Sequence, residues 1–199
     1  MEEPVYKTQG IIIKKADLGE AGRLLTIYTK NYGKILVRAK GIGKKESKLK
    51  SLIEPFNLCE FLIARSKTID VLTNVYPIKE FLWLHHNLDS LALAFYFAEL
   101  VDKLVIAPEH DENLWRLILR AFEVLNHPTP ALPLARGGSG RGEFSLLKVK
   151  FLFEQKLLEF LGHGIPKNKK ALEVIQGLAG EEIKSQKFLS NLFLSRSVF

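Results

Sequence analysis

The sequence predicts an α+β protein, with a small five-stranded β-barrel at the N-terminus followed by an all-helical region. Short β-branched runs with alternating apolar and polar residues fill the chain as far as Pro77, which is the pattern of half-buried strands. Beyond Pro77, apolar residues recur at steps of three and four, which is the spacing of amphipathic helices. We therefore expect a barrel domain over residues 1–79 and a helical domain over residues 80–199.

Five runs in the first domain fit β-strands. The turn residues Asn31, Tyr32 and Gly33 connect the second run to the third, as in a hairpin. The fourth run contains Pro55, whose missing N–H places it at a sheet edge or at a bulge. Five strands in about seventy residues are typical of a small barrel. The expected strands cover residues 6–15, 23–30, 34–40, 52–64 and 67–76.

The helical domain opens with two amphipathic segments. Asp89 is a candidate N-cap for the first, which stops near Pro108. The second has a single apolar stripe between Leu114 and Leu125. Acidic residues just before this stripe suit the positive end of a helix dipole.

A third segment, residues 144–161, is apolar on nearly every side. This pattern predicts the central and most buried helix, which Gly162 and Gly164 would end. Two weaker amphipathic segments follow, and a stretch rich in Pro and Gly precedes it, where we expect a flexible insert. The weaker segments are 170–178 and 181–194, and the insert covers 127–142.

Positive charge is concentrated in one stretch of the chain. Residues 30–50 contain eight basic residues and one acidic residue, a net charge of +7 that equals the formal net charge of the whole chain. Basic side chains of strand 34–40 share one face because side chains alternate, and a loop with Gly41 and Gly43 continues the charge. This surface suits a phosphate backbone, whereas a solvated loop that only aids solubility is the plain alternative. The candidate DNA-binding residues are Lys34, Arg38, Lys40, Lys44, Lys45, Lys48 and Lys50.

Aromatic rings near this charge are candidates for stacking on the bases of a single strand. Tyr28, Tyr32 and Phe56 lie close to it in the sequence. Each is more often a core or barrel-rim residue, so both interpretations stay open.

No catalytic or metal-binding pattern emerges from the sequence. The single cysteine, Cys59, cannot form an intramolecular disulfide or supply the two or more thiolates of a zinc ribbon. The five histidines show no metal-ligand spacing. The sequence KGIGKK lacks the ending of a P-loop, and no helix follows it. We therefore expect neither an enzyme nor a cofactor.

The sequence also predicts a cytoplasmic protein without a membrane anchor. A single cysteine fits a reducing compartment, and the first ten residues lack the apolar segment of a secretory signal. No apolar run reaches the roughly 18 residues that a spanning helix needs.

The stretch from Gly10 to Phe56, GIIIKKADLGEAGRLLTIYTKNYGKILVRAKGIGKKESKLKSLIEPF, resembles the bacterial RecO family of DNA repair proteins. Farther along, the sequence LGHG at 161–164 stands where that family leaves its long buried helix. Within the stretch, the matching features at family-like spacing are the glycine-initiated first strand, Gly19-Glu20, RLLT at 23–26, Gly33-Lys34, Lys40-Gly41 and residues 47–52.

This resemblance implies an OB-fold for the barrel and a nucleoid-associated protein that binds single- and double-stranded DNA. It further implies that the protein anneals complementary strands and helps to load the RecA recombinase together with RecR and single-strand-binding protein. Many members carry a four-cysteine zinc site after the position of Gly164. The corresponding segment here, IPKNKKALEVIQGL, has no cysteine, so we expect no zinc.

Two other functions remain open at this stage. An OB-fold module for structured RNA, such as a ribosome-associated factor, would keep the fold and change the ligand. A nuclease or phosphotransferase would need a catalytic site between barrel and helices, and magnesium-dependent strand cleavage would reveal it.

Overall fold

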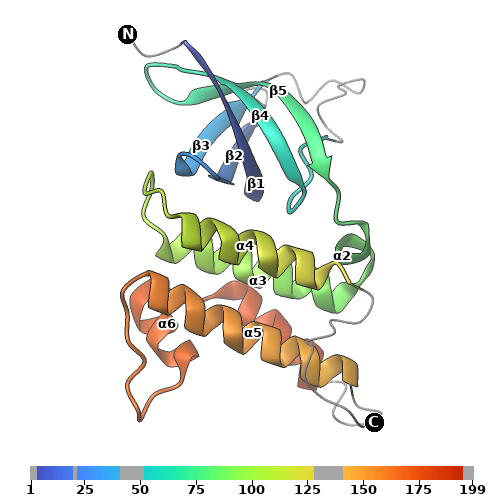
Figure 1. Cartoon of the computed structure of the whole chain (residues 1–199), viewed down its shortest axis with the longest axis vertical. Coiled ribbons are helices and arrows are strands. Elements are labelled where there is room, and N and C mark those ends of the chain that lie inside the picture. Colours follow the sequence, from blue (N-terminus) through green and yellow to red (C-terminus); the bar gives the residue numbers. More distant parts are fainter. Residues whose placement is uncertain (1–3, 20–21, 41–51, 128–140, 195–199) are drawn as a thin grey trace. The chain divides into compact units, whose positions relative to one another are not determined.

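A computed structural model describes residues 4–19, 22–40, 52–127 and 141–194. The chain forms two compact units (Figure 1). We call the first, which contains all five strands, the barrel unit, and the second the helical unit. The barrel unit comprises Met1–Glu80 and Val105–Trp115, and the helical unit comprises Phe81–Leu104 and Arg116–Phe199.

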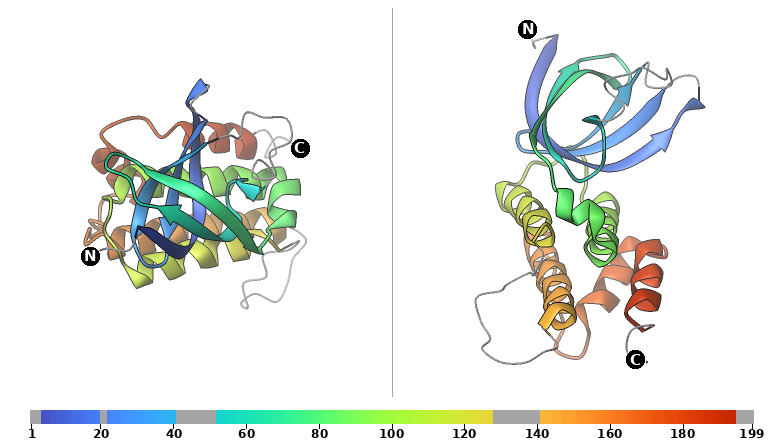
Figure 2. Two further views of the ribbon diagram at one scale, coloured as in Figure 1. Left: turned by 90° about the horizontal axis from the view of Figure 1, so that it is seen from above. Right: turned by 90° about the vertical axis from the view of Figure 1, so that its right-hand side faces the viewer.

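The barrel unit is a closed five-stranded barrel with the strand order β1-β2-β3-β5-β4. The first half of β1 pairs with β4 and the second half with β2, while β3 and β5 are parallel neighbours that close the sheet (Figure 2, right). The predicted N-terminal OB-fold barrel followed by helices is therefore confirmed. The strands are β1 (Val5–Asp17), β2 (Arg23–Thr29), β3 (Gly33–Ala39), β4 (Leu58–Ala64) and β5 (Asp70–Lys79).

Gly10 lies where β1 passes from one partner strand to the other, since it is in register with both Thr29 and Cys59. A Cβ at this position would come within 2.8 Å of Ile27 Cγ2. A glycine is therefore required here for the close approach of β2.

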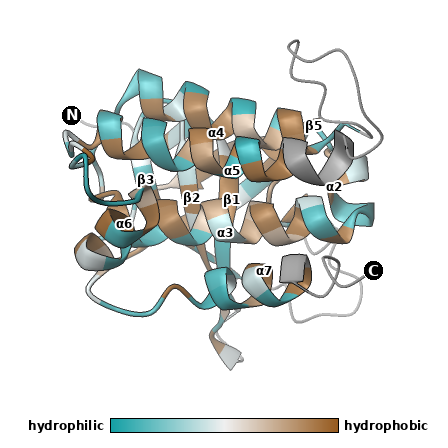
Figure 3. Cartoon of the chain, turned by 90° about the horizontal axis from the view of Figure 1, so that it is seen from below, coloured by the Kyte–Doolittle hydropathy of each residue, from teal (hydrophilic) through white to brown (hydrophobic). Residues whose placement is uncertain are grey.

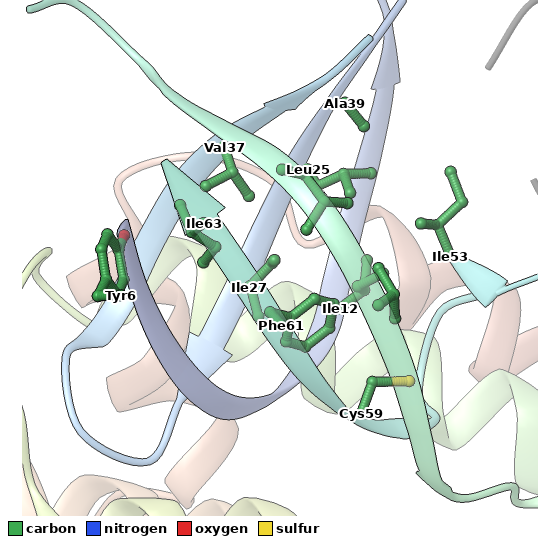
Figure 4. Packing of buried hydrophobic residues seen from close by; sticks show 12 residues of the cluster. Tyr6, Ile12, Leu25, Ile27, Val37, Ala39, Ile53, Cys59, Phe61 and Ile63 are labelled. Carbon is green, nitrogen blue, oxygen red and sulfur yellow. The ribbon is translucent and has the colours of Figure 1, made fainter. Parts of the chain in front are cut away.

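Alternate side chains of the strands fill the interior of the barrel (Figure 4). Ile12, Leu25, Ile27 and Phe61 are completely buried at its centre. Burial of a large aliphatic or aromatic side chain contributes about 1.5–3 kcal/mol, so this cluster holds the five short strands together. Because inward side chains occupy every second position, the remaining positions of each strand face outward.

The fourth strand is shorter than predicted. It begins at Leu58 rather than at residue 52, and Pro55 lies in a turn before it, not at an edge or bulge of a strand. Phe56 has φ +72°, its N–H bonds to the Ile12 carbonyl at 3.0 Å, and its side chain is completely buried. An apolar run looks the same in sequence whether it enters the core from a strand or from a turn, which explains the error.

The helices alternate hydrophobic and hydrophilic surface along their length (Figure 3). In α4, the predicted apolar stripe is buried, and the Asp111 carboxylate accepts the Asn113 N–H at 2.7 Å, which caps the first turn. The predicted insert at 127–142 lies outside the described residues except at its ends. The helices are α2 (Leu82–His86), α3 (Leu88–Leu104), α4 (Glu112–Leu125), α5 (Arg141–Phe160), α6 (Ala171–Ala179) and α7 (Lys184–Leu194).

The most buried helix is α3, so the prediction for residues 144–161 was wrong. Helix α3 contacts α2, α5, α6 and α7, and nine of its residues are buried. Helix α5 leaves Leu147, Phe151 and Leu152 between 40% and 50% exposed. Helix α5 is apolar on nearly every side, but this composition did not predict which helix is the most buried in the unit.

The ends of two helices are set by particular residues. Asn87, and not Asp89, caps α3, because its side-chain oxygen accepts the Ser90 N–H at 2.9 Å. Gly162 ends α5 as predicted, with φ +75° and with the following N–H, of His163, bonded to the Leu158 carbonyl at 2.8 Å. This is the hydrogen bond of a Schellman motif.

Candidate nucleic-acid interface

The outer face of β3 carries the predicted basic residues. Val37 and Ala39 point into the core and are buried, so the alternate residues Lys34, Leu36 and Arg38 lie on the outside. Leu36 is 45% exposed, and Lys40 follows the strand as an exposed residue. The predicted division of this strand into a core face and a basic face is confirmed.

Arg38 lies in the middle of the sheet, in register with Leu24 of β2 and Val71 of β5. Its side chain is half-buried, and its buried Nε has no hydrogen-bond partner among the residues that the structure describes. A buried donor without a partner costs about 1–3 kcal/mol. The Arg38 side chain therefore has one buried donor that the described residues leave unsatisfied.

One end of this face is covered by the barrel unit's own second segment, Val105–Trp115. Tyr28, in register with Lys34, is completely buried and stacks on Trp115 with a centroid distance of 6.5 Å and an angle of 13°. Burial raises the pKa of the Tyr28 hydroxyl, and the nearby carboxylates of Asp111 and Glu109 raise it further. The outer face of the sheet at Tyr28 is therefore covered by this segment.

Gly33 fixes the same segment against the sheet. Its φ is +62°, and a Cβ here would lie 2.0 Å from the carbonyl oxygen of Glu109. Lys34, the next residue, is half-buried. Arg38 and Lys40 are thus the predicted residues on the open part of the face.

The three aromatic candidates differ in how deeply the structure buries them. Tyr28 and Phe56 are completely buried, so they are core residues and do not offer stacking surfaces. Tyr32 is half-buried at the β2–β3 turn, with its ring edge-on to Tyr6 at 4.7 Å between centroids. It alone of the three remains near the surface.

Four of the predicted DNA-binding lysines lie outside the described residues. Residues 41–51 lie outside the described part of the chain. The prediction for these residues therefore stays a prediction. The four residues are Lys44, Lys45, Lys48 and Lys50.

The charges around the barrel distinguish the open face from the rest of its surface. Elsewhere, Lys7 pairs with Glu60 at 2.7 Å, and Lys15 pairs with Glu54 at 3.1 Å. Within the described ranges, Lys40 has no carboxylate partner.

Sequence reasoning missed Arg65, in the connection between β4 and β5. Its guanidinium lies 4.9 Å from the centroid of the Tyr6 ring, and the side chain is exposed. A single basic residue in a short loop gives no pattern in the sequence. The only signal was its nearness to Lys67 outside the main cluster of charge.

The described residues hold no group of three or more His, Cys, Asp or Glu side chains placed to bind a metal. Cys59 is buried, and burial raises the pKa of its thiol to about 11, so it is a poor nucleophile near neutral pH. A four-cysteine zinc site does not fit this chain, because it has only one cysteine.

A comparison with protein families identifies the barrel. Residues 1–81 match the family model described as "Recombination protein O N terminal". The barrel matches the N-terminal domain of the RecO family. The resemblance to RecO seen in the sequence is therefore confirmed, and the match covers every strand of the barrel.

Similarity to RecO proteins continues beyond the barrel. The chain is 31% identical over 121 residues to the DNA repair protein RecO of Pelotomaculum thermopropionicum, covering 61% of this chain and 47% of that protein. It is 33% identical over 164 residues to that of Trichodesmium erythraeum, covering 81% and 50%. With RecO of Desulfitobacterium hafniense it shares 27% identity over 179 residues, covering 90% and 59%. The chain spans about half the length of the curated relatives that it matches.

None of the described helices has the length and apolar character that crossing a bilayer requires.

Proposed function

We propose that this protein acts in DNA repair and recombination, by binding single- and double-stranded DNA on the RecO barrel and annealing complementary strands. The observation that carries the proposal is the open part of the β3 face. There, Arg38 has an unused buried donor and Lys40 has no carboxylate partner within the described chain. The names of the relatives, DNA repair protein RecO, support the same role.

The chemistry is that of a polyanion on a cationic surface. Each phosphate that a basic side chain neutralises releases condensed counterions, which favours binding at low salt. Arg38 and Lys40 would hold phosphates beside the barrel, and the lysines of the 41–51 loop would add charge. No base-specific contact is needed, so strands remain able to slide into register.

Annealing follows from the same contacts. Two complementary strands repel each other through their phosphates, and a basic surface that binds both lowers this repulsion. We infer a non-enzymatic mechanism, because it requires no bond to be broken. By family membership, the proposed partners are RecR, single-strand-binding protein and, indirectly, RecA, in the cytoplasm at the nucleoid.

Reversal of the two charges tests the proposal. In the double variant Arg38→Glu/Lys40→Glu, we expect a several-fold lower affinity for a single-stranded oligonucleotide. The slope of log K against log salt should fall in magnitude by about 1.4, since each phosphate contact on a single strand contributes about 0.7. Fluorescence anisotropy titrations at several salt concentrations measure both quantities.

The double variant Lys148→Glu/Lys187→Glu is the matched control, because it changes the net charge equally at exposed residues of the helical unit. It should keep the wild-type slope. An unchanged slope in the Arg38/Lys40 variant would contradict the assignment of these two residues as phosphate contacts. Competition by a matched RNA strand separates DNA binding from the RNA-binding alternative, in which RNA would compete better than DNA.

A further inference from the structure

The β4–β5 connection presents a planar cation at one end of the barrel. Arg65 lies over the Tyr6 ring, with its Cζ 4.9 Å from the centroid. Two hydrogen bonds hold the backbone at the start of the connection. The Arg65 N–H bonds to the Pro4 carbonyl at 2.9 Å, and the Ser66 N–H bonds to Asp70 Oδ1 at 3.0 Å. Arg65 is thus held on a fixed backbone.

The ring beneath Arg65 is equally fixed. The Tyr6 hydroxyl donates to Asp70 Oδ2 at 2.8 Å, and the Tyr6 ring is part of the barrel core at its edge (Figure 4). The Tyr32 ring meets it edge-on at 4.7 Å. The Tyr32 N–H is bonded to Thr29 Oγ1 at 3.1 Å. Three planar groups, Arg65, Tyr6 and Tyr32, therefore lie together on rigid supports, and we call them the planar cluster.

The connection reaches the sheet beside the proposed DNA-binding face. Strand β5 starts immediately after it, with Asp70 in register with Val37 and Val71 in register with Arg38. On the other side, Tyr28 lies under Trp115, which closes that route. A strand bound at Arg38 can therefore continue across β5 toward the planar cluster, and not along β3 toward Tyr28.

The charges along this route also favour an anion. Arg65 and Lys67 are exposed, as is Lys30 beside the β2–β3 turn. Asp70 already accepts hydrogen bonds from Tyr6 and Ser66. It therefore makes internal bonds with both of its oxygens, which moderates its repulsion of a phosphate.

We propose that Arg65, supported by Tyr6, stacks on a base of single-stranded DNA that leaves the β3 face. The inference rests on the proposed function and adds a base contact to its phosphate contacts. A guanidinium is flat and weakly hydrated, so it stacks on a nucleobase as well as on an aromatic ring. In the planar cluster, the Tyr6 ring lies beneath the Arg65 guanidinium, and the Arg65 side chain as a whole is exposed. The contact reads no sequence, because every base has a π-face.

The variant Arg65→Lys isolates stacking from charge. It keeps the positive charge and the backbone hydrogen bond to Pro4, but it replaces the planar guanidinium with an ammonium group that cannot stack. With an ordinary single-stranded oligonucleotide we expect about tenfold weaker binding, which is within the range for loss of one stacked base. With an abasic oligonucleotide of the same length, which has phosphates but no bases, the affinity should equal that of the wild type. The salt slope should not change.

Lys67→Ala is the matched control in the same connection. It removes one charge without affecting the planar cluster, so it should weaken binding of both oligonucleotides equally. Equal binding of the ordinary oligonucleotide by wild type and Arg65→Lys would overturn this inference and leave the proposed function intact. If the wild-type chain bound neither oligonucleotide, both would be overturned.

A measurement on the wild-type chain avoids any dependence on variant folding. A single-stranded oligonucleotide containing 5-bromouracil is bound and irradiated, and the cross-linked peptides are mapped. We expect cross-links to the peptide that contains Arg65 or to the one that contains Tyr32. Cross-links confined to β3 and the 41–51 loop would contradict the stacking contact.

Discussion

At the scale of single residues, the barrel separates side chains that serve packing from those available to a ligand. Tyr28 is a candidate for base stacking in the sequence and Cys59 is the single thiol, but both are buried. Arg38 keeps a buried donor that the described protein does not satisfy. Natural proteins rarely leave such groups without a partner, and this is one reason why we propose Arg38 as part of the DNA-binding face.

The buried thiol of Cys59 gives a prediction about pH. Burial raises its pKa from 9.0 to about 11, so between these values the unfolded thiol loses its proton while the folded one keeps it. The folded state then binds more protons, and the free energy of unfolding falls as the pH rises from 9 to 11. Denaturant unfolding of wild type and Cys59→Ala at pH 8 and pH 10.5 measures this.

We expect the difference in stability between the two proteins to shrink at the higher pH. Comparison with the variant removes the contribution of the other groups that titrate in this range. If the difference in stability were the same at both pH values, burial would not raise the pKa of the Cys59 thiol.

At the scale of elements, the segment Val105–Trp115 decides which part of the β2–β3 face is open. It runs from the end of α3 into the first turn of α4 but belongs to the barrel unit. Its contact with the sheet depends on Gly33, whose neighbour is the Glu109 carbonyl. A glycine here serves close approach as well as the turn conformation.

The variant Gly33→Ala tests this contact. The new Cβ would meet the Glu109 oxygen at 2.0 Å, and φ of +62° disfavours any side chain. We expect a loss of about 2 kcal/mol or more in the free energy of unfolding, measured by denaturant titration. Gly164→Ala is the control, because nothing lies within 4 Å of its added Cβ, and its loss should be below about 1 kcal/mol. Similar losses in both variants would argue against a tight contact at Gly33.

The elements also show what sequence patterns can predict. Alternation in β3 correctly placed Val37 inside and Arg38 outside, because the period of a strand is fixed by its backbone. The start of β4 was missed, because Phe56 is buried from a turn with positive φ. The covering of Tyr28 by Trp115 joins residues 87 positions apart in the chain, and no local pattern reports such a contact.

At the scale of the whole molecule, the net charge of +7 resides in residues 30–50, and the barrel displays part of it on one open face. The family of the barrel could be inferred from the sequence, since its turn glycines and basic residues stand in a specific order. Arg65 could not be inferred, because its role depends on Tyr6, which lies beside it only after the barrel closes. Residues 80–199 contain as many acidic as basic side chains.

Strand annealing by the full chain tests the central claim most directly. Two complementary oligonucleotides, labelled as a fluorescent donor and acceptor, are mixed with and without the protein at low and high salt. The account predicts that the wild-type chain accelerates annealing at low salt, and that both high salt and the Arg38→Glu/Lys40→Glu change remove most of this acceleration. Equal acceleration by the double variant and the wild type, or an acceleration insensitive to salt, would contradict the assignment of the β3 face as the DNA-binding surface.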